Sequence, residues 1–192
     1  MSERSESADA SPDTLILRAE TAADLPEVLQ LIEKAFGPES DEPRLVELIH
    51  RRGHARLGTV AQTDRLNGYV LATPLSLDPG PGLPPVELSC LGIAPLAVLP
   101  EMQGLGVGSK LMWSLIERAA RQDRGKGGSD AIDALFLLGA PGYYARFGFR
   151  PTHIGNEYGA ADAFMALELT GDCLQCVVAA ARYVSEFSEA GV

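Results

Sequence analysis

The alternation of hydrophobic and polar positions along the chain predicts a succession of strands and helices. Short aliphatic runs predict strands over 15–18, 56–62, 66–75, 90–99, 134–138, 149–151 and 164–169. Apolar residues three or four positions apart predict helices over 25–36, 44–52, 107–122 and, shorter, 141–147. Since strands and helices alternate, we expect an α/β fold with a mixed sheet flanked by helices.

Segments rich in glycine, proline and charged residues separate these elements. They predict loops at 37–43, 78–85 and 123–130. Residues 1–14 contain Ser, Asp and Glu but almost no large apolar side chain, so we expect a disordered tail there. In the C-terminal stretch 171–192, apolar residues at helical spacing favour a helix.

A glycine-rich turn joins the strand over 90–99 to the helix that follows it. The turn reads Gln103-Gly104-Leu105-Gly106-Val107-Gly108-Ser109-Lys110. The first N–H groups of a helix have no acceptor within the helix, and the helix dipole adds positive charge there. Glycine lets an anion approach the backbone closely. The turn is therefore a candidate phosphate or pyrophosphate site.

The spacing of the glycines separates three kinds of phosphate-binding turn. A P-loop requires Gly-Lys followed by Ser or Thr, and here the lysine follows a serine. A dinucleotide fingerprint requires G-x-G-x-x-G early in a βαβ unit, whereas Gly104, Gly106 and Gly108 alternate and lie far along the chain. The third pattern is Gln/Arg-x-x-Gly-x-Gly/Ala after an apolar strand, and Gln103, Gly106 and Gly108 satisfy it.

Together with the strand residues from Leu96 onward, this turn resembles the acetyl-CoA-binding motif of the GNAT acetyltransferase superfamily. A second segment, 143–151, resembles the Tyr-x-x-x-Gly-Phe segment that follows the fifth strand in that superfamily. The two motifs are separated by room for a helix, a loop and a strand. Within the superfamily, the chain is most similar to the small bacterial branch of predicted N-acetyltransferases.

The resemblance implies a GNAT-like mixed, mostly antiparallel sheet of six to seven strands, in which the fourth and fifth strands splay apart. It implies one acetyltransferase domain over 15–170, preceded by the tail and followed by an extension, 171–192, packed on the domain. For this extension, the resemblance offers an extended aromatic end as the alternative to the helix.

The resemblance also implies an activity, the transfer of an acetyl group from acetyl-CoA to a primary amine by direct attack on the thioester. Backbone groups of Leu96, Ala97 and Val98 would bind the pantetheine arm, as an added strand would. Backbone groups of the turn would bind the pyrophosphate, and the residues concerned are Gln103, Gly104, Leu105, Gly106, Val107, Gly108 and Ser109.

Aromatic residues of the second motif take different expected roles. Tyr144 stands at the position of a tyrosine whose hydroxyl can protonate the departing CoA thiolate. A purely packing role for Tyr144 stays open. Tyr143 is expected in the core. Arg146 could reach the CoA phosphates, and a solvated helix face is the favoured interpretation.

The base that deprotonates the amine is not identified by the sequence. Glu87, just ahead of the fourth strand, is the nearest candidate, and an exposed strand-edge carboxylate is an equally good interpretation. Glu39, Asp41 and Glu42 form an acidic loop that borders the acceptor site in similar enzymes. Such a loop would attract a cationic amine, for example a polyamine, an aminoglycoside or a basic peptide end, and a solvated loop without this role is an equally good interpretation.

Composition narrows the class further. The chain has 192 residues, 46% of them hydrophobic and 22% charged, which suits one globular domain. A net charge of −10 argues against binding to nucleic acid. No apolar run is long enough to span a membrane and no signal peptide is evident, so we expect a cytoplasmic protein without membrane association.

Cys173 and Cys176 form one C-x-x-C pair, which is weak evidence for zinc because zinc takes four ligands, and the three histidines show no ligand spacing, so we expect no metal. Three cysteines suit reduced thiols in the cytoplasm. A monomer or a homodimer is expected. Two other functions stay open: a non-catalytic acyl-CoA-binding or regulatory module, and a nucleotide-binding protein that uses the same turn.

Overall fold

The computed structural model describes residues 14–122, 131–159 and 162–192. The strands are β1 (Ile16–Ala19), β2 (Leu57–Gln62), β3 (Leu66–Pro79), β4 (Cys90–Val98), β5 (Ala134–Leu138), β6 (Arg150–Pro151), β7 (Gly155–Asn156), β8 (Phe164–Glu168) and β9 (Ala179–Tyr183). The helices are α1 (Leu25–Phe36), α2 (Glu42–Arg52), α3 (Val107–Ala120), α4 (Pro141–Tyr144) and α5 (Glu186–Ala190). Short 3-10 turns are η1 (Ala22–Asp24), η2 (Pro100–Met102) and η3 (Ala145–Phe147). No helix within the described ranges is long and apolar enough to cross a bilayer.

One mixed sheet connects all the strands. Its order is β1-β2-β3-β4-β5-β8-β6, with β9 beside the end of β3 and β7 beside β9. The β4–β5 and β7–β9 pairs are parallel and the others antiparallel, which confirms the expected mixed, mostly antiparallel sheet. The described residues form nine strands rather than six to seven, because β7 and β9 add to the seven expected from the sequence.

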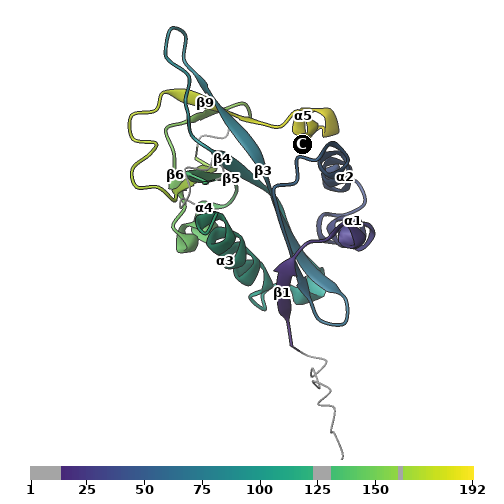
Figure 1. Ribbon diagram of the computed structural model, residues 1–192. Coiled ribbons are helices and arrows are strands. Elements are labelled where there is room, and N and C mark those ends of the chain that lie inside the picture. Colours follow the sequence, from purple (N-terminus) through teal and green to yellow (C-terminus); the bar gives the residue numbers. More distant parts are fainter. Residues whose placement is uncertain (1–13, 123–130, 160–161) are drawn as a thin grey trace, which may run out of the picture.

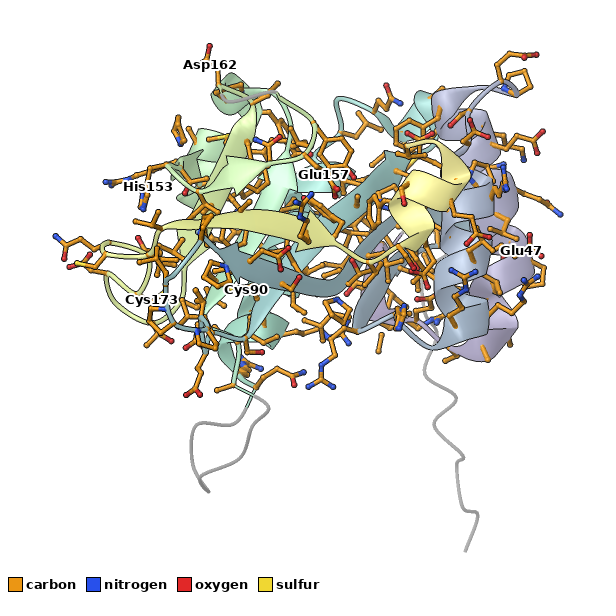
Figure 2. The ribbon with its side chains drawn as sticks, turned by 90° about the horizontal axis from the view of Figure 1, so that it is seen from above. Glu47, Cys90, His153, Glu157, Asp162 and Cys173 are labelled. Atoms are coloured by element: carbon orange, nitrogen blue, oxygen red, sulfur yellow. The ribbon has the colours of Figure 1, made fainter. Side chains whose placement is uncertain are left out.

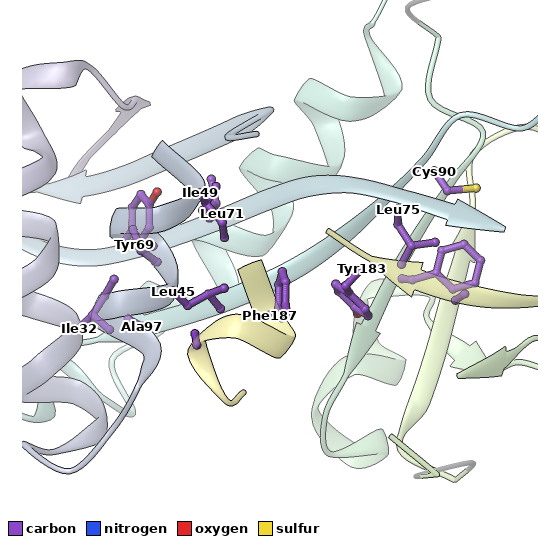
Figure 3. Close-up of a cluster of buried hydrophobic side chains, with 14 of the residues drawn as sticks. Ile32, Leu45, Ile49, Tyr69, Leu71, Leu75, Cys90, Ala97, Tyr183 and Phe187 are labelled. Atoms are coloured by element: carbon purple, nitrogen blue, oxygen red, sulfur yellow. The ribbon is translucent and has the colours of Figure 1, made fainter. Parts of the chain in front are cut away.

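Helices cover both faces of the sheet (Figure 1). On one face, α3 buries Leu111 and Leu115 in a cluster with Val70 of β3 and Leu135 of β5. On the other face, α1, α2 and α5 pack over a second cluster, which includes Leu45 of α2. Figure 3 shows this second cluster, with Phe187 of α5 between Leu45 and Tyr183 of β9. The sheet therefore separates two cores, as the amphipathic pattern of the helices requires.

Strands β4 and β5 are paired only where they begin. Residues 90–92 pair with residues 134–136, and beyond that point β4 continues along β3 to Val98 while β5 stays with β8. The β3–β4 register shifts opposite Ala94 and Pro95, where β4 carries one extra residue. Residues 93–98, two thirds of β4, therefore have a free edge on the side of β5, which confirms the predicted splay.

Two expectations for the fold are wrong, and they have one cause. Asp78 and Pro79, expected in a loop, extend β3, because β9 pairs with residues 75–79 and provides a partner for them. The stretch expected to be helical forms β9 instead, followed by the short helix α5. Its helical spacing is a local signal, and pairing with a distant strand overrides it.

Candidate functional site

The turn between β4 and α3 presents open backbone to solvent. Gly104 and Gly106 have φ of +76° and +83°, a left-handed conformation that favours glycine, and a Cβ at either position would meet nothing within 4 Å. The Gln103 side-chain amide donates to the Val98 carbonyl at 3.1 Å and closes the turn. In front of the turn is a pocket of about 310 Å³. The first N–H groups of α3 have no acceptor within the helix, which suits an anion there.

The residues expected to bind pyrophosphate lie together around this pocket, with one exception. Gln103, Gly104, Gly106, Val107, Gly108 and Ser109 line it. Leu105 is not among the lining residues, and 66% of its surface is exposed to solvent.

The positively charged side chain of Arg146 lines the same pocket. The Arg146 guanidinium lies 4.7 Å from the centroid of the Tyr143 ring, and both side chains line the pocket. A Cβ at Gly108 would lie 2.9 Å from the Tyr143 hydroxyl, so glycine there makes room for this tyrosine. Arg146 is exposed, as expected, and it also borders the candidate anion site. Tyr143 packs against the core, but it is half-buried and lines the pocket rather than being fully enclosed. A guanidinium over a helix N-terminus strengthens its attraction for phosphate.

The free edge of β4 presents backbone groups to the space between the splayed strands. The Leu99 N–H donates to the Asn67 carbonyl at 3.0 Å, on the β3 side. Backbone groups alternate sides along a strand, so those of Ala97 also face β3, and those of Leu96 and Val98 face the gap. Of the three residues expected to bind an extended ligand, Leu96 and Val98 are therefore placed to do so. Ala97, 1% exposed, is turned the other way.

A second pocket, of about 290 Å³, lies further along this free edge. Residues 93–96 of β4 and Leu138 of β5 form its floor, and Tyr144 of α4 enters it. Other walls come from distant parts of the chain: Phe36, Glu42, Leu45, Tyr158, Tyr183, Phe187 and Val192. The free edge of β4 thus leads from the glycine turn to a mainly apolar pocket.

Tyr144 is held firmly at this second pocket. Its ring contacts Gly139, where a Cβ would lie 2.2 Å from Cε2 of the tyrosine. The ring centroids of Tyr143 and Phe149 are 4.9 Å and 6.2 Å away. Burial, and to a smaller extent the neighbouring Tyr143, raise the pKa of Tyr144 to about 12. The phenol is therefore protonated at neutral pH, as a proton donor must be.

Glu87 and Tyr144 line different pockets. Glu87 is exposed and lines a groove together with Leu83, Cys173 and Cys176. Glu87 precedes Ile93, the first residue of β4 in the Tyr144 pocket, by six positions, which is about 20 Å of extended chain. The structure therefore does not support Glu87 as the base.

Glu42 is the acidic residue that reaches the Tyr144 pocket. It is the first residue of α2 and half-buried, whereas Glu39 and Asp41 are exposed and do not line the pocket. The expected acidic loop thus contributes one carboxylate to the pocket, and the other two carboxylates lie at the surface nearby.

The cysteines take no part in either pocket. Cys90 is buried and Cys173 half-buried, and burial raises their pKa values to about 12 and about 11. Both thiols therefore stay protonated and poorly nucleophilic at neutral pH. Figure 2 shows the two at the end of the sheet away from α1 and α2. Among the described residues, no group of three or more His, Cys, Asp or Glu could hold a metal ion.

The splayed sheet, the glycine turn and the aromatic pocket along one free strand edge define an acetyltransferase-type α/β domain. The sequence model of the acetyltransferase (GNAT) family matches residues 25–149. The chain belongs to this family.

Individual relatives agree with this assignment. The chain is 28% identical to the uncharacterized N-acetyltransferase YhbS of Escherichia coli, over 91% of this chain and 99% of that protein. A crystal structure of YhbS in complex with CoA matches with a TM-score of 0.77 and covers 91% of this chain and 92% of that one. A GNAT family acetyltransferase from Brucella melitensis, crystallised with acetyl-CoA, is 27% identical, with a TM-score of 0.69 and coverages of 91% and 98%.

The aromatic wall of the second pocket was missed by sequence reasoning. Tyr158, Tyr183 and Phe187 come from the C-terminal part of the chain, beyond the two motifs. The sequence signal that could have identified this wall is the aromatic character of the tail, which by itself indicates only extended backbone. Which face these rings occupy depends on the pairing of β9 with β3, which no local pattern shows.

Proposed function

We propose that the protein transfers the acetyl group of acetyl-CoA to a primary amine. The observation that carries this proposal is the continuity of one strand edge. The free side of β4 leads from the glycine turn, past the outward-facing backbone of Val98 and Leu96, to the pocket that Tyr144 enters. An extended thioester with a phosphate group at one end and a reactive carbonyl at the other fits this arrangement.

Each part of acetyl-CoA has a matching part of the protein. The pyrophosphate would accept hydrogen bonds from backbone N–H groups at Gly106 and Gly108, with the Arg146 guanidinium beside it. The pantetheine amides would pair with the backbone of Val98 and Leu96, as an added strand does. The CoA and acetyl-CoA complexes of the two relatives described above support CoA as the ligand.

The chemistry follows from the second pocket. A neutral amine nitrogen attacks the thioester carbonyl carbon, so that a C–N bond forms and the C–S bond breaks. The departing thiolate takes a proton from the Tyr144 hydroxyl, and the nitrogen loses a proton to solvent or to a carboxylate. Holding the two reactants in one pocket supplies much of the acceleration, since attack then becomes effectively unimolecular.

We further propose that the acceptor is cationic in solution, because Glu42 lines the pocket and Glu39 and Asp41 lie at the surface nearby. Negative potential at the entrance raises the local concentration of a cation and repels a carboxylate. This attraction should weaken with salt, since the Debye length is about 8 Å at physiological ionic strength.

Calorimetry and turnover together test the proposal. Binding of acetyl-CoA with no binding of ATP or NAD would support the CoA site, and equal binding of all three would contradict it. Release of CoA thiol in the presence of an amine library, lost in Tyr144→Phe, would support transfer. Binding of acetyl-CoA without turnover for any amine would identify a non-catalytic acyl-CoA-binding module instead.

A further inference from the structure

We infer that the acceptor is a small amine with a single positive charge and an apolar body, aryl or alkyl, rather than a polyamine or an aminoglycoside. This inference rests on the proposed function and narrows its substrate class. It is drawn from the walls of the Tyr144 pocket, which combine several aromatic rings with one ionised side chain among the described residues that line it.

Three aromatic rings of the pocket, those of Tyr158, Tyr183 and Phe187, pack against one another in a corner beside β4. The Tyr183 ring centroid is 4.6 Å from that of Phe187 and 5.9 Å from that of Tyr158, the second pair at an interplanar angle of 72°. Tyr183 is fixed in place by Gly92 of β4, where a Cβ would lie 2.2 Å from its Cε1. Such rings bind apolar groups by contact, and their faces attract a cation.

The two tyrosines of this corner add no charge. Burial, and secondarily Glu157, raise the pKa of Tyr158 to about 12. Burial likewise raises the pKa of Tyr183 well above its ordinary value. Both phenols are therefore neutral at physiological pH, and the corner is an uncharged surface for an apolar group.

Acidic residues close to this corner already have basic side chains as partners. Glu157 and Asp78 both bind Arg182, at 3.4 Å and 3.1 Å. Glu186, next to Phe187 in the chain, is fully buried and contacts His54 at 2.7 Å. None of these three carboxylates lines the pocket.

Among the described residues that line the pocket, Glu42 provides the side-chain carboxylate that is placed to meet an ammonium. It accepts a hydrogen bond from the Ser40 hydroxyl, and its oxygens can accept further hydrogen bonds. Glu42 can pair with one ammonium and accept its proton, so that the nitrogen is neutral when it attacks. Glu42 is then neutral as well, and a second ammonium of a polyamine would lie against aromatic and aliphatic walls without a carboxylate partner, which is unfavourable.

Size points to the same class of ligand. The pocket volume of about 290 Å³ is at the low end for ligand pockets, which run from roughly 300 to 1,000 Å³. A phenyl or short alkyl group fits such a space, and a multi-ring aminoglycoside does not.

The first experiment compares kcat/KM for phenethylamine and hexylamine with that for spermidine and kanamycin, at fixed acetyl-CoA. We expect the two monoamines to be preferred by at least about tenfold, or roughly 1.4 kcal/mol. A polycation used as well as or better than the monoamines would overturn the inference and leave the acetyltransferase proposal standing. Absence of turnover with every amine would overturn both.

Two substitutions locate the effect at the pocket. Glu42→Gln should raise KM for phenethylamine about tenfold or more, with an unchanged Kd for acetyl-CoA. Glu47→Gln, at an exposed position of the same helix but outside the pocket, is the matched control and should leave KM unchanged. Equal effects of the two substitutions would contradict the assignment of Glu42.

A gain of preference provides an independent check. Phe36 lines the pocket and is 44% exposed, so a polar replacement is compatible with the fold. Phe36→Asp adds a second carboxylate and should shift the ratio of kcat/KM for 1,6-diaminohexane over hexylamine toward the diamine, by about fivefold or more. An unchanged ratio would show that the charge count of the pocket does not select the acceptor.

Discussion

The ring of Tyr144 lies directly on the backbone of Gly139, so closely that a Cβ on the glycine would be 2.2 Å from Cε2 of the tyrosine. Gly139 follows β5 immediately, and Tyr144 ends α4. Gly139, which does not line the pocket, therefore determines the position of Tyr144, the proposed proton donor. Gly92 and Tyr183 repeat this relationship on β4, with a Cβ distance of 2.2 Å to Cε1.

Removal of the Tyr144 hydroxyl gives the first prediction. Tyr144→Phe keeps the ring and its contact with Gly139 but removes the acid, so kcat should fall roughly 10²–10⁴-fold. The Kd for acetyl-CoA, measured by calorimetry, should change little. A fall of less than about threefold would show that another group, or water, protonates the thiolate.

Displacement of the same ring gives the second prediction. Gly139→Ala keeps the hydroxyl but pushes the ring aside, so kcat should drop by at least about tenfold, because catalysis depends on sub-ångström placement. Gly142→Ala is the matched control, since a Cβ there meets nothing within 4 Å and the position is also in this segment. Circular dichroism should show both variants folded. Full activity in Gly139→Ala would mean that the position of Tyr144 is unimportant.

Parts of this site were predictable from the sequence because they depend on local backbone chemistry. Gly104 and Gly106 adopt left-handed conformations that favour glycine, and Gln103 closes the turn with a bond to a residue five positions earlier. The splay of β4 from β5 and the position of Tyr144 came from the family resemblance, and the structure reproduces the splay.

The remainder depends on contacts between distant segments. The β9 strand forms because residues 75–79 of β3 need a partner, and this pairing brings Tyr183 to the pocket. Glu87 was the candidate base because it lies near β4 in the chain, but it lines another groove. Glu42 lines the Tyr144 pocket through the packing of distant segments, which no local pattern shows. Helical spacing in the tail was misleading for the same reason: short apolar patterns fit either element until packing decides.

Closure of the phosphate turn gives the third prediction. Gly106→Val introduces a branched side chain at φ +83°, in front of the first turn of α3, and should weaken CoA binding more than tenfold. Gly53→Val is the control for strain alone, because Gly53 has φ +76°, an equally open Cβ position and no place in the pocket. Both variants should lose stability, and only Gly106→Val should lose affinity. Equal CoA affinity in the two variants would contradict the site.

The cation beside the turn gives the fourth prediction. Arg146→Gln should weaken CoA binding about three- to tenfold at low salt, because an exposed ion pair contributes about 1 kcal/mol. The difference from wild type should shrink at high salt, where the charge is screened. Arg121 is exposed and forms an ion pair with Glu117 at the other end of α3. The control variant Arg121→Gln should therefore bind CoA as wild type does. The same salt dependence in Arg146→Gln as in wild type would show that this guanidinium does not meet a phosphate.

The last prediction concerns the pH dependence of stability at the start of α1. The Asp24 carboxylate accepts two bonds of 2.7 Å from the Arg18 guanidinium and one of 2.7 Å from the Thr21 N–H. The bond from Arg18, with those from Thr21, holds the pKa of Asp24 well below its ordinary value. A lowered pKa in the folded state means that the unfolded chain binds the proton more readily. Stability from this group is therefore present above its unfolded pKa of about 3.9 and is lost as pH falls below that value toward the folded pKa.

Asp24→Asn should therefore lower the free energy of unfolding by about 1–2 kcal/mol at pH 7, a value reduced for the partial exposure of Arg18. In thermal melts this corresponds to roughly 2–8 °C in Tm. The gap between wild type and variant should stay constant from pH 8 to about pH 5 and narrow steadily below pH 4, as wild-type Asp24 is protonated on unfolding. Glu33→Gln, at an exposed position of α1, should show no comparable gap at pH 7. A gap for Asp24→Asn that persists unchanged to pH 2.5 would mean that the carboxylate stabilises the fold by its shape rather than by its charge.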